Sequence, residues 1–288
     1  MADQSMTNLG GKTMQEPVAT VDYNPAEIPV VILCGGMGTR LREASEKLPK
    51  PLVDIGGMPI LWHIMKTYGH FGFRRFILCL GYKGDQIRRH FLDYREHMND
   101  FTLELGSDAP PQFHKRGEAE DWEITFVETG LLTGTGGRVR RVADHIDTDL
   151  FLLTYGDGIG AVDIDSLVKQ HLASGLLGTV TGVHPASRYG EMHVDGTRVT
   201  EFNEKPTLAT GWVSGGFFAF NKVMIDKYLD DDADLLLEKK PLQALASDGE
   251  LGVFRHEGFW MGMDTFRDWT ELNSLWDAGN PPWRIWDN

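Results

Sequence analysis

The chain of 288 residues is poor in cysteine and has no long apolar run. Its two cysteines, Cys34 and Cys79, lie in apolar segments, where cysteine behaves as a small hydrophobe, so we expect buried free thiols and no disulfide scaffold. No apolar stretch approaches the roughly 18 residues that a membrane span requires. Residues 1–27 also lack the apolar core of a signal peptide. We therefore expect a cytoplasmic protein without a membrane partner.

Positive charge is scarce as well. The chain carries 28 lysines and arginines against 42 aspartates and glutamates, which gives a formal net charge of −14 at pH 7 and an isoelectric point near 5.1. Such an acidic protein is poorly suited to bind nucleic acid or an anionic membrane surface. If it binds anionic substrates, it must gather positive charge at one site and recruit a metal ion there.

Several common catalytic motifs are absent. The ten histidines form no zinc-binding pattern, since the sequence has no H-E-x-x-H and no matching cysteine set. It also has no G-x-S-x-G elbow. A Walker A loop would need Gly-Lys-Ser/Thr, and the dinucleotide fingerprint G-x-G-x-x-G fails because Leu41 stands in its last place. Neither of these two phosphate-binding loops is therefore present.

Apolar runs typical of strands alternate with helical patterns along most of the chain. We predict strands at residues 30–34, 76–80, 150–154 and 176–183, with helices from Pro59, after residue 84 and at 164–173. From about residue 189 the pattern changes to a hairpin around Asp195-Gly196, strands at 213–220 and 251–254, and helices at 222–229 and 266–276. This order predicts an α/β fold: a mostly parallel Rossmann-like sheet flanked by helices, an antiparallel hairpin region and a short C-terminal helical part.

The domain organisation follows from composition. Residues 1–28 are polar and rich in glycine, which predicts a flexible N-terminal extension. Residues 29–288 contain no internal repeat and no low-complexity linker, so we expect a single domain there. Four tryptophans gather near the end of the chain, and packing in the core or at a subunit interface explains them better than chemistry does.

The most informative segment is a strand that ends in glycines. Residues 30–34 lead into the string GGMGTR at 35–40, and Lys50 follows between two prolines. Glycines leave backbone N–H groups open to an anion, because no Cβ blocks the approach. Thr39 adds a hydroxyl, Arg40 a fork of donors and Lys50 a mobile charge, a set that suits a triphosphate. The alternative for this segment alone is an ordinary glycine turn.

Two aspartates are candidates for a metal site. Asp157 follows an apolar strand and lies between two glycines, so a ligand can approach it closely. Mg²⁺ prefers carboxylate oxygens together with water and phosphate oxygens. Asp264 follows another strand and is the candidate for the second carboxylate, although it could instead cap the helix that begins at Thr265. Its position in the sequence favours neither interpretation.

Three further segments could bind substrate. The string TGTGGR at residues 133–138 is a second glycine-rich loop that could offer backbone groups to a base and Arg138 to a phosphate, or could be a plain turn. Glu204 and Lys205 precede a proline that directs Lys205 out of a regular ladder, where it could bind a monoester phosphate or lie at a solvated loop tip. Gly215 and Gly216, inside an apolar strand, indicate a close backbone approach by a ligand such as a sugar or by a neighbouring chain.

Together these motifs resemble the glucose-1-phosphate cytidylyltransferases, a branch of the sugar-1-phosphate nucleotidylyltransferases, over nearly all of residues 30–286. The string GGMGTRL, the proline-flanked lysine, the Gly-Asp pair and Glu-Lys-Pro are similar to the signature of the superfamily. The strings ILWHIMK, TGGR, TYGDG and FWMGMDTFRD are similar to the cytidylyl branch. The chain departs from the usual family pattern at residues 188–192 and 261–262, near the expected sugar site, which leaves the sugar open.

The resemblance implies transfer of a cytidylyl group from CTP to α-D-glucose 1-phosphate, giving CDP-glucose and pyrophosphate for deoxysugar or polysaccharide synthesis. It also implies a homo-oligomer, a sugar-binding part from about residue 185, and Mg²⁺ as cofactor on Asp157 and Asp264. The catalytic residues that it implies are Arg40, Lys50, Asp157 and Asp264. The implied nucleotide-binding residues are Leu33, Cys34, Gly35, Gly36, Met37, Gly38, Thr39, Arg40, Lys50, Thr133, Arg138 and Gly156. The implied sugar-phosphate-binding residues are Glu204, Lys205, Gly215 and Gly216.

Two alternatives stay open. The same scaffold could transfer a uridylyl or thymidylyl group, or could accept another sugar phosphate. A catalytically silent relative could bind a sugar nucleotide as a sensor or partner subunit. The presence of Lys50, Asp157, Lys205 and Asp264 argues against silence.

Overall fold

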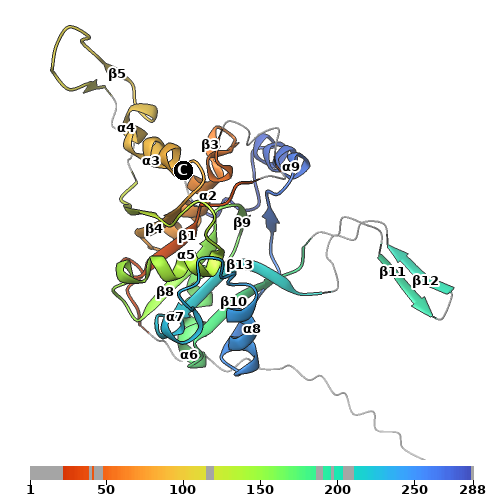
Figure 1. Cartoon of the computed structure of the whole chain (residues 1–288). Helices are drawn as coiled ribbons and strands as arrows, with labels where there is room; N and C mark the ends of the chain where they lie inside the picture. The colour runs from red at the N-terminus through yellow and green to blue at the C-terminus, as the bar shows by residue number, and fades with distance from the viewer. Residues whose placement is uncertain are drawn as a thin grey trace, which may run out of the picture.

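The computed structural model describes residues 22–38, 41, 48–114, 120–185, 191–195, 198–203 and 211–286. Its centre is a seven-stranded sheet in the order β14-β10-β13-β8-β1-β4-β7, with helices on both of its faces (Figure 1). The strands are β1 (Pro29–Leu33), β4 (Arg75–Leu80), β7 (Glu123–Glu128), β8 (Leu150–Tyr155), β10 (Gly178–Val183), β13 (Val213–Asn221) and β14 (Leu251–His256).

The strands of this sheet are parallel apart from β13. Strand β1 pairs parallel with β4 and β8, β4 with β7, and β10 with β14. Strand β13 runs antiparallel to both of its neighbours, β8 and β10. Parallel strands covered on both faces need an almost continuous apolar sequence, and every residue of β1 is buried. The predicted mostly parallel α/β sheet is confirmed.

Two hydrophobic cores lie on opposite faces of the sheet. Alternate residues of β1 divide between them, with Val30 and Ile32 in the first core and Val31 and Leu33 in the second. The first core includes side chains of α2 (Ile60–His70), α3 (Gly84–Leu92), α6 (Ile164–Ser174) and α9 (Phe266–Asp277). The second includes those of α5 (Thr135–Arg141), α7 (Val223–Tyr228) and α8 (Lys240–Ser247).

Local sequence explains where several helices begin and end. Helix α2 begins directly after Pro59, as predicted. Helix α6 is capped by Asp163, whose side chain accepts a hydrogen bond from the Ser166 N–H at 2.9 Å, and it ends at Gly175 with a φ of 67°. These caps satisfy backbone groups that a helix end would otherwise leave without partners.

The C-terminal tryptophans pack into the first core around His63. The ring centroids of Trp276, Trp283 and Trp286 lie 4.9, 6.2 and 6.1 Å from that of His63. Burial lowers the pKa of His63 to about 4, so the ring is neutral at physiological pH. Packing in the core, one of the two interpretations of this cluster, is confirmed for these three side chains.

Two hairpins extend away from the sheet (Figure 1). The hairpin of β11 (Glu191–Asp195) and β12 (Arg198–Asn203) confirms the prediction around Asp195. The other, of β5 (Phe101–Thr102) and β6 (Gln112–Phe113) after the short helix α4 (Tyr94–His97), was not predicted. The shorter elements are β2 (Asp54–Ile55), β3 (Met58–Pro59), β9 (Gly158–Gly160), β15 (Trp260–Gly262) and the 3₁₀ turns η1 (Lys50–Leu52) and η2 (Ala143–His145).

The N-terminal segment is described only in part. Residues 1–21 of the predicted extension lie outside the described residues, whereas Ile28 is buried and the Tyr23 hydroxyl donates to Asp165 at 2.9 Å. Cys34 and Cys79 are buried free thiols, as predicted. Within the described part of the chain, no helix is both long and apolar enough to cross a membrane.

Candidate active site

A pocket lies at the carboxyl ends of β1 and β8, where the sequence predicted ligand binding. Leu33 of β1 pairs with Tyr155 of β8, and the N–H of Gly156 donates to the Leu33 carbonyl at 3.1 Å, which holds the two strand ends together. The residues that line the pocket are Leu33, Cys34, Gly36, Gly38, Lys50, Pro51, Gly156, Asp157 and Asp264. Apart from Pro51, all of these are predicted site residues, and they surround one space.

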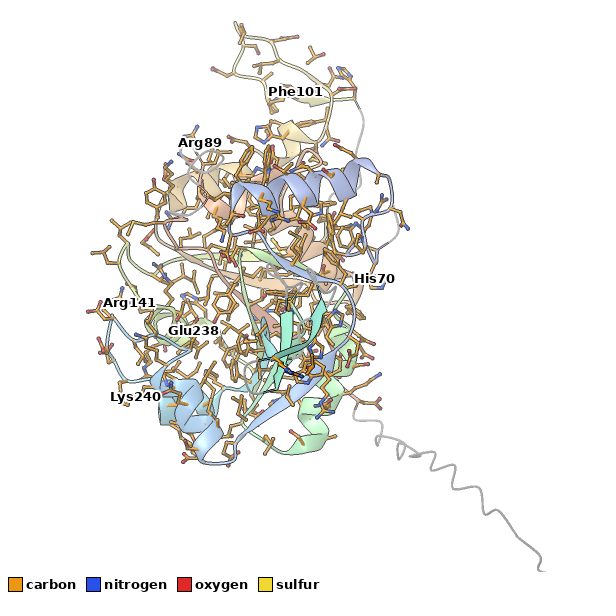
Figure 2. The ribbon with its side chains drawn as sticks, turned by 90° about the vertical axis from the view of Figure 1, so that its right-hand side faces the viewer. His70, Arg89, Phe101, Arg141, Glu238 and Lys240 are labelled. Atoms are coloured by element: carbon orange, nitrogen blue, oxygen red, sulfur yellow. The ribbon has the colours of Figure 1, made fainter. Side chains whose placement is uncertain are left out.

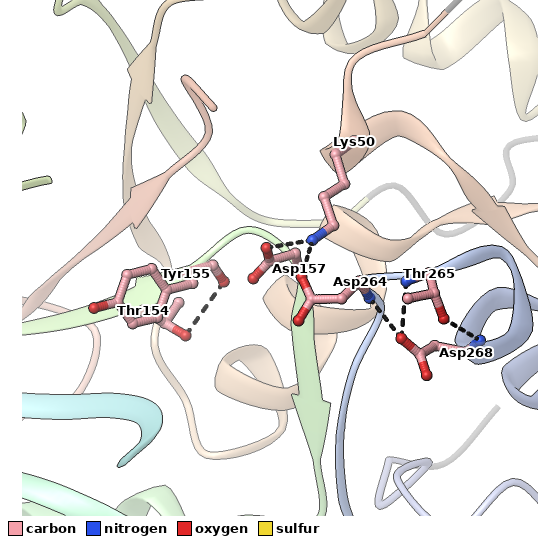
Figure 3. Close-up of polar contacts among 7 residues, drawn as sticks. All are labelled: Lys50, Thr154, Tyr155, Asp157, Asp264, Thr265 and Asp268. Carbon is pink, nitrogen blue, oxygen red and sulfur yellow. Dashed lines mark hydrogen bonds and ion pairs between the residues drawn. The ribbon is translucent and has the colours of Figure 1, made fainter. Parts of the chain in front are cut away.

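Lys50 forms the centre of the charged part of this pocket. Its Nζ donates to Asp157 Oδ2 at 2.7 Å and to Asp264 Oδ1 at 2.8 Å (Figure 3). Burial acts to lower the pKa of Lys50, but the ion pairs with both aspartates outweigh burial and hold the pKa above its ordinary value. The ammonium group therefore stays charged at neutral pH.

Asp264 is brought close to Asp157 by a short ladder of paired residues between two strands. Strand β15 pairs antiparallel with β9, which starts directly after Asp157, and the Met263 N–H donates to the Asp157 carbonyl at 2.8 Å. The helix-cap interpretation of Asp264 is wrong, because Thr265 caps α9: its side chain accepts from the Asp268 N–H, and Asp268 accepts from the Thr265 N–H in return. The Asp264 carboxylate instead accepts a hydrogen bond from Lys50.

The carboxylate pair fits a magnesium site. One cationic group already lies within hydrogen-bond distance of an oxygen from each aspartate, so both carboxylates converge on one region. The two carboxylates are 39% and 43% exposed, which leaves room for water and phosphate oxygens, the other ligands that Mg²⁺ usually keeps. Among the described residues, no group of three or more His, Cys, Asp or Glu side chains could hold a metal. A metal on this pair would therefore share its coordination with substrate.

The glycine loop follows β1 and is described up to residue 38. Gly38 has a φ of 59°, a conformation that favours glycine, and a Cβ there would lie 3.1 Å from the Lys50 Cβ. Among the described residues beyond its chain neighbours, none has an atom within 4 Å of a Cβ added at Gly36, so the loop is open there. Thr39 and Arg40, both predicted to bind the nucleotide, lie outside the described residues.

Arg138 packs directly against this loop. Only 4% of the residue is exposed, and its guanidinium donates to the carbonyls of Gly35, Leu80 and Leu131 and to the Thr129 hydroxyl at 2.7–3.3 Å. A Cβ at Gly35 would lie 2.0 Å from Nη1, so a side chain there would displace the guanidinium from this position. Desolvation lowers the pKa of Arg138. The structure thus shows Arg138 bracing the loops after β1, β4 and β7, and its direct contact with phosphate stays a prediction.

The second glycine-rich loop is covered by another part of the chain. The Gly134 N–H donates to the Ala233 carbonyl at 2.7 Å, and the N–H groups of Gly136 and Gly137 donate to the Leu235 carbonyl at 2.9 and 3.2 Å. A Cβ at Gly134 would lie 2.4 Å from the Leu235 oxygen. The expectation that this loop offers its backbone donors to a base is therefore wrong for these three groups, because residues 233–235 already accept from them.

Three further predicted residues lie within the described part of the chain: Thr133, Gly215 and Gly216. Thr133 is half-buried, and its hydroxyl accepts from Arg141 Nη1 at 2.8 Å. A Cβ at Gly215 would meet Val183 at 2.7 Å, and one at Gly216 would meet the Tyr155 ring at 2.6 Å, so neighbouring side chains account for the close approach predicted there. Glu204 and Lys205 lie outside the described residues.

Three residues at this site were not identified from the sequence. The Trp260 indole donates to the Gly215 carbonyl at 2.7 Å, and the Tyr155 hydroxyl donates to Glu238. Tyr155 stands inside the TYGDG string, so its place beside Asp157 could have drawn attention to it. Trp260 likewise stands inside the FWMGMDTFRD string, whereas Glu238 carries no local signal, since its partner Tyr155 lies 83 residues away in the chain.

Comparison with known proteins agrees with this site. A family model described as nucleotidyl transferase matches residues 29–279. The chain therefore belongs to the nucleotidyl transferase family, the superfamily that the motifs resemble.

Within that family the chain is similar to glucose-1-phosphate cytidylyltransferases of several bacteria. The chain is 45% identical over 258 residues to the glucose-1-phosphate cytidylyltransferase of Salmonella typhi, a match that covers 89% of this chain and 99% of that protein. It is 44% identical over 256 residues to the probable glucose-1-phosphate cytidylyltransferase of Bacillus subtilis strain 168, with the same coverage. Among solved structures, HddC from Yersinia pseudotuberculosis matches with a TM-score of 0.63 and 25% identity over 86% of this chain and 99% of that chain.

Proposed function

We propose that this protein transfers the cytidylyl group of CTP to α-D-glucose 1-phosphate and releases CDP-glucose and pyrophosphate. The observation that carries this proposal is the cluster of Lys50, Asp157 and Asp264 beside the glycine loop. A cation and two carboxylates next to a phosphate-binding loop suit a reaction between two phosphates. Identity of 44–45% to glucose-1-phosphate cytidylyltransferases supports CTP and glucose 1-phosphate as the substrates.

The reaction requires the protein to align the two substrates and to supply positive charge. A phosphate oxygen of glucose 1-phosphate attacks the α-phosphorus of CTP in line, and the bond from that phosphorus to the bridging oxygen of the pyrophosphate breaks, with the electron pair leaving on pyrophosphate. The nucleophile is already an anion, so no general base is needed. The protein must offset repulsion between the two substrates and hold the reacting atoms in line.

The charged residues divide this work. Residues 35–38 bind the triphosphate through backbone N–H groups, and Arg138 keeps this loop in place. Lys50 and Arg40 stabilise negative charge on the α-phosphate and on the departing pyrophosphate. Thr133 completes the nucleotide contacts, and Lys205 with Glu204 holds the sugar phosphate.

Asp157 and Asp264 would hold Mg²⁺, which when bound neutralises part of the charge on the phosphate oxygens. Lys50 donates to one oxygen of each aspartate, so a metal held by the same pair would lie close to the ammonium group. The ammonium group also lies in the pocket beside the loop that binds the triphosphate. Homo-oligomeric assembly and a cytoplasmic location stay predictions.

A pyrophosphate-release assay tests this function. CTP, UTP, dTTP and GTP are each paired with several sugar 1-phosphates, and the sugar nucleotide is identified by mass. Cytosine donates at position 4 where uracil accepts, so a site built around that edge should favour CTP by at least about tenfold in kcat/KM. Comparable rates with UTP or dTTP would replace the cytidylyl assignment by that alternative. No turnover with any pair would favour the silent binding protein.

A further inference from the structure

Glu238 joins two segments that carry different parts of the site. Its Oε1 accepts a hydrogen bond from the Tyr155 hydroxyl, and its Oε2 accepts one from the Thr135 hydroxyl at 2.7 Å. The Thr135 oxygen in turn accepts from the Leu237 N–H at 2.9 Å. We call Tyr155, Glu238 and Thr135 the Glu238 bridge (Glu238 is labelled in Figure 2).

The two ends of the bridge lead to the two halves of the pocket. Thr135 is the first residue of α5, the helix whose Arg138 packs against the glycine loop. Tyr155 is the last residue of β8 and stands two positions before Asp157; Figure 3 shows Asp157 in contact with Lys50 and the Tyr155 ring pointing away from that contact. The carboxylate of Glu238 therefore links α5, whose Arg138 packs against the glycine loop, to β8, which ends two residues before the predicted metal ligand Asp157.

Tyr155 and the segment before Glu238 are held in place by packing, whereas Glu238 itself is exposed. The Tyr155 ring lies against Gly216, where an added Cβ would come within 2.6 Å of it, and packs edge-on to Phe218 at 6.1 Å. Glu238 follows Leu235 and Leu237, both buried in the second core. The two hydrogen bonds that its carboxylate accepts are therefore what fix the exposed Glu238 side chain.

We propose that Glu238 is a positioning residue for nucleotidyl transfer, which fixes the end of β8 relative to α5 through Tyr155 and Thr135. The inference rests on the proposed function for its kinetic part. In-line attack requires the triphosphate and the carboxylate pair to keep a fixed spacing, because small misplacements of reacting groups cost large factors in rate. None of the three residues needs to touch substrate for this role.

The test combines kinetics with equilibrium binding. Glu238→Ala should lower kcat/KM for CTP and weaken CTP affinity, measured by calorimetry without sugar phosphate, by about tenfold each, the loss typical of hydrogen bonds to a charged group. Glu238→Gln, which keeps an oxygen acceptor and the side-chain length, should restore most of both. Tyr155→Phe should lower kcat/KM in the wild-type background and leave it unchanged in the Glu238→Ala background, since the partner is already gone.

The chain offers a matched control. The Tyr228 hydroxyl donates to the Asp248 carboxylate at 2.8 Å, the same kind of bond between residues that do not line the pocket. Asp248→Ala should leave kcat/KM and CTP affinity at wild-type values. A melting temperature measured for every variant separates loss of stability from loss of position.

Each outcome decides one question. If the wild type makes CDP-glucose and Glu238→Ala matches it in kcat/KM and CTP affinity, the positioning role is overturned and the proposed function stands, whatever the melting temperature does. If Tyr155→Phe lowers kcat/KM equally in both backgrounds, the bridge is also overturned. If the wild type has no activity, the proposed function fails and CTP affinity alone decides: equal values for wild type and Glu238→Ala overturn the bridge.

Discussion

Replacement of Lys50 by methionine should increase the affinity of the Asp157 and Asp264 pair for a divalent cation. Nζ of Lys50 lies 2.7 and 2.8 Å from one oxygen each of Asp157 and Asp264. A divalent cation that binds both carboxylates would lie close to this ammonium group and would be repelled by its charge. Methionine keeps the length of the side chain and removes its charge, so the variant should bind a divalent cation without nucleotide more tightly than the wild type does.

The structure sets the size of the effect. Removal of one partner from a fully buried ion pair costs about 3–5 kcal/mol. Lys50 is only 9% exposed, but the carboxylates are 39% and 43% exposed, so solvent reduces the cost to about 2 kcal/mol. In domains of roughly 150–250 residues, 1 kcal/mol changes Tm by about 2–4 °C, which gives a fall of about 4–8 °C. Mn²⁺ at 100 times its Kd would return about 2.7 kcal/mol to the variant.

Thermal unfolding with and without excess MnCl₂, in the absence of nucleotide, measures both effects. The matched control is Lys66→Met, which removes a lysine ion-paired to Glu120 at 3.0 Å outside the pocket lining. Addition of Asp157→Asn to Lys50→Met should abolish the response to Mn²⁺. Equal Mn²⁺-induced shifts in Tm for the wild type, Lys50→Met and Lys66→Met would refute the reasoning.

Three other predictions concern Asp264, His63 and Arg138. Asp264→Ala should lower kcat at least about 100-fold, as loss of other charge-stabilising groups does. Thr265→Ala should retain kcat and lower the free energy of unfolding in urea by about 1 kcal/mol. The reverse pattern would restore the helix-cap interpretation of Asp264. The pKa of His63 is about 4 in the folded protein, against an ordinary value of 6.5 that applies once the chain unfolds, so only the unfolded chain takes up the proton between these values. Stability should therefore fall by roughly 3 kcal/mol as pH drops from 6.5 to 4, and an equal fall in a His63→Leu variant would contradict this. Arg138→Met should weaken CTP binding by at least about tenfold, and an unchanged calorimetric affinity would show that the glycine loop holds its shape without the brace.

The central sheet could be predicted because its inner strands are buried on both faces. A strand covered on both sides must be apolar at nearly every position, and β1 and β8 show this in PVVIL and LFLLTY. Strand β7, with sequence EITFVE, was missed because it is a half-exposed edge strand and its pattern is weak. The reversed direction of β13 leaves no mark in its own sequence, because direction depends on which neighbours it pairs with.

The site residues also divide into those that local sequence predicts and those that only tertiary structure brings together. Glycines at a strand end identify the loop and Asp157, because such backbone conformations and close approaches demand glycine locally. The meeting of Lys50 with Asp264, 214 residues apart, depends on tertiary structure, and only the family resemblance pointed to it. The contact between Gly134 and Leu235 could not be predicted from either segment. A glycine in the sequence does not indicate whether a ligand or another backbone segment packs against it.

The three-residue ladder between β9 and β15 determines where this chain can change length. Gly158 pairs with Gly262 and Gly160 with Trp260; β9 begins directly after Asp157, and β15 ends two residues before Asp264. Side chains alternate along a strand, so one inserted or deleted residue in either segment would turn Asp157 or Asp264 to the opposite face. The hairpin at residues 101–113 extends away from the sheet and can lengthen or shorten without this consequence. A homologous sequence that keeps both aspartates but carries a one-residue gap in this ladder would therefore have lost the carboxylate pair, although a motif search would still find each half of it.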